Sequence, residues 1–229
     1  MRLRGAFGLF SFAVATMAVG AEYRIDPHYS REPVCVAMTK ALNRGAIVDV
    51  RTPVCRRRMD ISGNREGLSS ASLRKIGLQD HRQLLIEMLM ITGAPMASDK
   101  AGQRADDIIR SSEVRIYATR LDPDNGGHVR NIYVVDNTIC EPEWSSNPVS
   151  PAVYVEAVNG ELDPYWGKGS FALGYPFFYK GQTYYAQWQS NGPRFSPSLL
   201  LDSPLVVSEF NRSMFKQEVF ALVCPIERK

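Results

Sequence analysis

Histidine and cysteine are scarce in this chain, and the short motifs that mark common enzyme classes are missing. The 229 residues include three histidines and four cysteines. No histidine pair has the helical spacing of a metalloprotease, no two cysteines have zinc-finger spacing, and Gly-x-Ser-x-Gly does not occur. The sequence therefore gives no positive sign of an enzyme, and we lean toward a non-enzymatic protein.

Strong net charge and long apolar runs are also missing. The chain has 27 basic and 24 acidic side chains, and removing Arg2 and Arg4 with the N-terminal segment leaves 25 against 24. Proteins that bind nucleic acid by neutralising phosphates need a large basic excess, so we expect no nucleic-acid partner. Beyond residue 21, no apolar run approaches the roughly 18 residues of a transmembrane helix. We expect no transmembrane segment in the mature chain.

The N-terminal 21 residues are typical of a cleaved export signal. Arg2 and Arg4 are followed by a mainly apolar stretch over residues 6–19, which is too short to span a bilayer. Small residues stand at the junction, and polar sequence begins at Glu22. This order predicts a signal peptide over residues 1–21 and a periplasmic or secreted mature protein.

The four cysteines are an even number in an exported chain, which predicts two disulfides. Three pairings are possible. We favour Cys35–Cys55, because it closes a short loop, together with Cys140–Cys224, because both lie at the ends of alternating runs that could be neighbouring strands.

The order of predicted elements indicates an α+β fold, with N-terminal helices packed on a mainly antiparallel β region. Residues 22–96 contain two predicted helices, over 33–44 and around the apolar stretch 84–91, which we expect to be buried on nearly all sides. Residues 97–112 are polar without clear periodicity, and we interpret them as a linker. Residues 113–229 alternate with period two and are predicted to be β-rich. Both portions should form one compact unit.

Lys180-Gly181 predicts a two-residue hairpin turn, which fixes the faces of its strands. In that register Phe177 lies opposite Tyr184 on a core face. Phe178 and Tyr185 lie on the other face, which is too apolar to be left wet. We expect the N-terminal helices to cover this face; the alternative is a partner-binding patch.

The loop Asp122-Pro123-Asp124-Asn125-Gly126-Gly127 places carboxylates two residues apart before glycines, an arrangement that can bind calcium. Asp122, Asp124 and Asn125 are the candidate ligands. The alternative, which we favour, is a turn whose side chains bond its own backbone.

Two segments resemble known families. The strand-loop-strand over 114–135 resembles the aspartate-rich hairpins of integrin-type β-propeller repeat proteins, although Gly126 or Gly127 stands where that loop has a third acidic residue. Residues 177–188 are similar to paired aromatic strands in secreted bacterial β-proteins of unknown function. The resemblance implies partial propeller-like hairpin packing as the alternative fold.

We expect an exported binding protein with a protein partner, for example a periplasmic inhibitor or an immunity protein for a toxin or hydrolase. Residues 165–195 hold 11 of the 23 aromatics, and aromatic faces can stack on sugars. A glycan-binding or glycan-cleaving envelope protein is therefore one alternative. A structural envelope component is another.

Overall fold

The computed structural model describes residues 22–44, 61, 66–91, 97–112, 114–137, 153–157, 159–163, 175–188, 205–211 and 219–228. The predicted signal peptide lies outside these residues. The described helices are η1 (Pro27–Tyr29), α1 (Pro33–Asn43), α2 (Arg82–Ile91) and α3 (Ser98–Ser111). None of these helices is long and apolar enough to cross a membrane.

Ten strands form two antiparallel sheets in this part of the chain. The six-stranded sheet has the order β1-β10-β9-β8-β7-β2, and the four-stranded sheet has the order β3-β4-β5-β6. Their bounds are β1 (Tyr23–Ile25), β2 (Leu68–Ser70), β3 (Arg74–Lys75), β4 (Val114–Leu121), β5 (Arg130–Asn137), β6 (Val153–Val155), β7 (Tyr175–Tyr179), β8 (Gln182–Trp188), β9 (Leu205–Asn211) and β10 (Val219–Arg228). The α+β prediction is confirmed.

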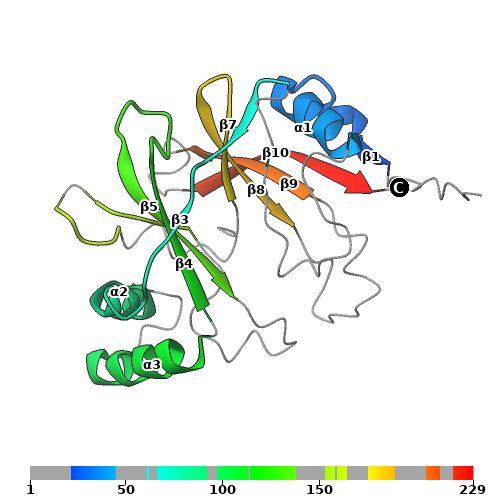
Figure 1. Cartoon of the computed structure of the whole chain (residues 1–229). Coiled ribbons are helices and arrows are strands. Elements are labelled where there is room, and N and C mark those ends of the chain that lie inside the picture. Colours follow the sequence, from blue (N-terminus) through cyan, green and yellow to red (C-terminus); the bar gives the residue numbers. More distant parts are fainter. Residues whose placement is uncertain are drawn as a thin grey trace, which may run out of the picture.

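The elements stack as four layers, in the order α1, six-stranded sheet, four-stranded sheet, and the pair α2 and α3 (Figure 1). A separate buried cluster fills each of the three gaps between layers. The buried side chains of β4, β5, β6, β7 and β8 divide between two of these clusters, in keeping with the period-two pattern of the sequence. Within the described residues, the two sheets thus stack face to face.

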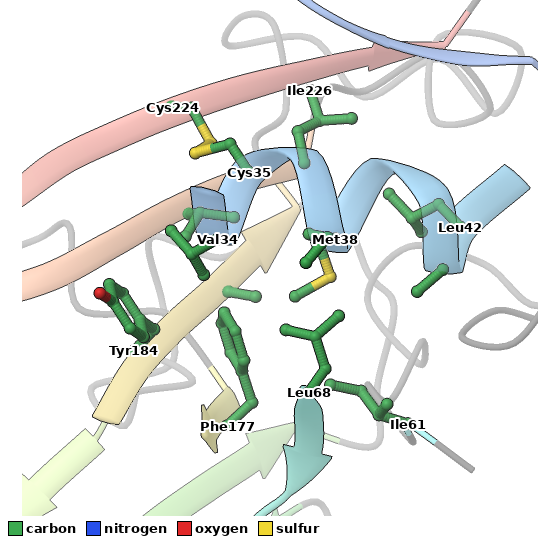
Figure 2. Close-up of a cluster of buried hydrophobic side chains, with 14 of the residues drawn as sticks. Val34, Cys35, Met38, Leu42, Ile61, Leu68, Phe177, Tyr184, Cys224 and Ile226 are labelled. Atoms are coloured by element: carbon green, nitrogen blue, oxygen red, sulfur yellow. A yellow bond between two sulfur atoms is a disulfide. The ribbon is translucent and has the colours of Figure 1, made fainter. Parts of the chain in front are cut away.

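Helix α1 forms where the sequence predicts it, with Pro33 in its first turn. Its inner face packs on the six-stranded sheet, where Met38 lies near Leu68 and Phe177 (Figure 2). All three of these side chains are buried. This helix therefore provides the outer cover of one sheet.

A disulfide joins Cys35 of α1 to Cys224 of β10, 189 residues further along the chain (Figure 2). This bond uses one cysteine from each pair that we favoured, so Cys35–Cys55 and Cys140–Cys224 are both wrong. Proximity along the chain misled the prediction, because α1 lies against β10, which is far from it in the sequence. Cys55 and Cys140 lie outside the described residues.

The segment interpreted as a linker, residues 97–112, is instead the helix α3. Its inner face consists of Ala101, Ala105 and Ile108, each fully buried and spaced by four and then three positions. Two members of this stripe are alanines, whose weak hydrophobicity concealed the helical period. The small side chains let α3 lie close to α2 in one shared core cluster.

Helix α2 has the predicted position but buries only part of its surface. Its buried side chains face the four-stranded sheet and α3, whereas Met90 is 39% exposed. The expectation of burial on nearly all sides is therefore wrong. On the outer side, Arg82 forms an ion pair with Asp106 of α3 at 2.7 Å.

The side chain of Asn43 caps an edge of the six-stranded sheet. Its Oδ1 accepts a hydrogen bond from the N–H of Tyr23 at 2.6 Å, and its Nδ2 donates to the carbonyl of Tyr23 at 2.9 Å. An amide side chain thus replaces a neighbouring strand beside β1. Occupied edge groups are unavailable for pairing with another chain.

Candidate functional site

The aromatic hairpin of β7 and β8 has the predicted register. Phe177 pairs with Tyr184, and Tyr179 pairs with Gln182 across the Lys180-Gly181 turn. The rings of Phe177 and Tyr184 stack with centroids 5.8 Å apart and are buried beneath α1. The prediction of a core face is confirmed.

The second face of this hairpin is covered by the four-stranded sheet. Tyr185 is 1% exposed, and Phe178 is partly buried in the same cluster. The facing side chains include Tyr117 and Leu121 of β4 and Ile132 of β5. The expectation that N-terminal helices cover this face is therefore wrong, because α1 covers the opposite face and α2 lies beyond the second sheet. Phe178 and Tyr185 are inter-sheet packing residues here.

The aspartate loop between β4 and β5 is held by its own side chains. The two carboxylate oxygens of Asp122 accept hydrogen bonds from the N–H groups of Gly126 at 3.1 Å and Gly127 at 2.6 Å. Asp124 Oδ1 accepts a further bond from the Gly126 N–H at 3.3 Å. These are the contacts expected of a turn that satisfies its own backbone.

The same loop also reaches across to β8 in the other sheet. The Oδ1 of Asn125 accepts the N–H of Thr183 at 2.6 Å, and its Nδ2 donates to the Thr183 carbonyl at 3.1 Å. The Thr183 hydroxyl donates to the carbonyl of Asp122 at 2.6 Å, and the Tyr185 hydroxyl donates to that of Pro123 at 3.1 Å. Residues 122–125 therefore bind the two sheets together.

The electrostatics of the loop suit this arrangement. Partial burial raises the pKa of Asp122, but the Gly127 and Gly126 N–H groups and a bond to Asp124 hold that pKa below its ordinary value. The ionised Asp122 therefore stabilises the folded state. This stabilisation is complete above the pKa of Asp122 in the unfolded chain, about 4, and is lost as the pH falls through the lower pKa of the folded protein. Burial, with the charges of Asp124 and Asp122, raises the pKa of Tyr185, so its hydroxyl keeps the proton that it donates.

We expect added calcium to leave the Tm of this protein unchanged. Both carboxylate oxygens of Asp122 and the side-chain oxygen of Asn125 already accept hydrogen bonds, which an ion would have to displace. Thermal melts with and without millimolar calcium check this, with Asp124→Ala as the control. A Tm that rises in the natural chain but not in Asp124→Ala would instead establish the calcium site.

A polar cluster on the helix-bearing face of the four-stranded sheet was missed by the sequence reasoning. Glu156 Oε2 accepts hydrogen bonds from Tyr133 Oη at 3.0 Å and from Asn131 Nδ2 at 2.8 Å. Burial, the hydrogen bond to Glu156, and the charges of Glu156 and Glu87 raise the pKa of Tyr133 to about 12. The Tyr133 hydroxyl therefore keeps the proton that it donates to Glu156 to a higher pH than an ordinary tyrosine would.

This cluster brings together residues from two hairpins. Asn131 and Tyr133 lie two positions apart on β5, and the N–H of Glu156 bonds the carbonyl of Asn131 at 2.9 Å. The alternation of the predicted strands places Asn131 and Tyr133 on one face, but the register that brings Glu156 beside them is not encoded in either strand alone. A carboxylate held in this way can accept hydrogen bonds from a polar ligand.

No family model, curated protein or solved structure that we compared with the chain matches it. The class of protein is therefore given by the architecture itself, an α+β fold with two stacked antiparallel sheets between helical layers.

Proposed function

We propose that this chain is an exported protein that acts by binding a protein partner, as a periplasmic inhibitor or as an immunity protein that caps a toxin or hydrolase. Export is supported by the basic and apolar order of the first 21 residues and by the buried Cys35–Cys224 disulfide, which needs an oxidising compartment.

The binding proposal rests on one observation. The aromatic side chains of the hairpin and the polar side chains of the aspartate loop, which were the candidate binding residues, pack in the core or hold the loop in place. The paired aromatics Phe177 and Tyr184 fill the gap beneath α1, and Tyr185 fills the gap between the sheets. Asp122 and Asn125 hold the loop and its contact with β8. A stapled, layered scaffold whose distinctive residues support the fold is suited to presenting a rigid outer surface to a partner.

The alternative of glycan binding through the aromatic region needs aromatic faces open to sugar rings. Phe177, Tyr184 and Tyr185 are each at most 9% exposed, so these three rings do not offer such faces. This observation favours a protein partner over a glycan. The third possibility, a structural envelope component, is separated from both by the experiment below.

Affinity capture with the mature chain, residues 22–229, tests the proposal. The control bait is the same chain reduced and alkylated, which lacks the Cys35–Cys224 link. We expect one protein to be retained by the oxidised bait alone and to form a stoichiometric complex when both are purified and mixed. Retention of glycan fragments would support the glycan alternative, and binding to neither would contradict both binding proposals.

The second disulfide is expected to join Cys55 to Cys140. Four cysteines in an exported chain favour two disulfides. Because Cys35 bonds Cys224, Cys55 and Cys140 are the two cysteines that remain to form the second bond. Non-reducing peptide mapping should recover one peptide pair for each bond. Free thiols at Cys55 and Cys140 would contradict the second disulfide and leave the first in place.

A further inference from the structure

A gap in strand pairing lies beside Thr183 in the six-stranded sheet. Strand β8 pairs with β7 from Gln182 to Ala186, but it pairs with β9 only from Tyr185 to Trp188. The N–H and carbonyl of Thr183 instead bond the side-chain amide of Asn125, which comes from the other sheet. Asn125 thus takes the place of a β9 residue.

The apolar part of the contact between the sheets does not by itself select one arrangement. The cluster there joins Tyr185 to side chains such as Tyr117 and Leu121 of the four-stranded sheet. Hydrophobic burial is non-directional and tolerates alternative packings. Directional hydrogen bonds in a buried setting do discriminate between arrangements, because a shift leaves polar groups unsatisfied.

We propose that the loop 122–127 is an inter-sheet clasp, a conformational device in which Asn125 substitutes for a strand beside Thr183 and thereby fixes how the two sheets stack. Thr183 is 1% exposed, so releasing Asn125 leaves a buried N–H and carbonyl unpaired unless the sheets move apart to admit water. Each sheet keeps its own ladder of hydrogen bonds in either case. The clasp therefore governs the stacking of the sheets and not their formation.

Asn125→Gly removes the two hydrogen bonds that the Asn125 side chain makes to Thr183. The bonds from the Thr183 and Tyr185 hydroxyls to the loop carbonyls do not depend on this side chain. The backbone at Asn125 has φ of 55°, in the left-handed region that glycine adopts without strain, so the loop can keep its path. Asn43→Ala is the matched control, because Asn43 makes the same pair of bonds with Tyr23 at an outer edge and not between the sheets. Asn43 lies at the end of α1, where alanine suits the helical backbone.

Amide hydrogen exchange measured by NMR on the full mature chain provides the test. In Asn125→Gly we expect the protection of the Thr183 amide to fall by about tenfold. The amides of Tyr184 in the six-stranded sheet and Ile132 in the four-stranded sheet should keep the protection that they have in the natural chain. We also expect weaker NOEs between the Tyr185 ring and the side chains of β4. Asn43→Ala should lower the protection of the Tyr23 amide and leave Thr183 unchanged.

Three results would overturn the proposal. Unchanged protection of Thr183 in Asn125→Gly would show that the bonds do not hold the sheets. An equal loss at Thr183 and throughout both sheets would show a general loss of stability. An unfolded Asn125→Gly chain would show that the loop is needed for folding and not for stacking.

Discussion

Replacing Cys35 and Cys224 with alanine is expected to lower the free energy of unfolding by about 5 kcal/mol. The bond closes a loop over a sequence separation of 189 residues, and the loop-entropy relation gives about this value for so long a loop. Both cysteines are fully buried between α1 and the six-stranded sheet, so the bond also holds the outermost layer in place. Urea denaturation followed by circular dichroism measures the loss.

The double variant Cys55→Ala/Cys140→Ala is the matched control for this experiment, because it keeps the bond between α1 and β10. The Cys35/Cys224 variant should also show a larger m-value, since its unfolded chain is less compact. Equal unfolding midpoints for the natural chain and the Cys35/Cys224 variant would contradict a stabilising role for this bond.

The strands and hairpins of this fold were predictable because their signals are local. Alternation over eight residues specifies β4 and β5, and Lys180-Gly181 specifies both the turn and the register of β7 with β8. Helix α1 was predictable for the same reason, since Pro33 and the spacing of its apolar residues lie within one segment. In each case the physical cause lies within about twenty residues.

The predictions that were wrong mostly concern which segments contact each other in the folded chain. The partner of Cys35 lies near the other end of the chain, and no local pattern states that α1 packs on β10. Either face of the aromatic hairpin could have received the helices, because both faces are apolar. Helix α3 was missed for a different reason, since Ala101 and Ala105 bury little apolar area and leave a weak periodic signal.

The contacts of the candidate site also fall into two groups, those within one loop and those between distant segments. The bonds from the Gly126 and Gly127 N–H groups to Asp122 follow from the sequence of one loop, and the turn interpretation anticipated them. The contact of Asn125 with Thr183 spans 58 residues, and the contact of Tyr133 with Glu156 spans 23. Such contacts depend on the stacking and register of sheets, which a sequence read segment by segment does not specify.

Phe177→Ala is expected to cost about 3–5 kcal/mol, clearly more than Phe178→Ala. Phe177 is 1% exposed and stacks on Tyr184 beneath α1, so its truncation opens a cavity between α1 and the six-stranded sheet. Phe178 points to the other face and is only partly buried against the four-stranded sheet, so removing its ring should cost about 1–2 kcal/mol. Urea denaturation of both variants gives the comparison. If Phe178→Ala unfolds like the natural chain, the second sheet does not pack on this face, and the stacking on which the clasp acts is contradicted as well.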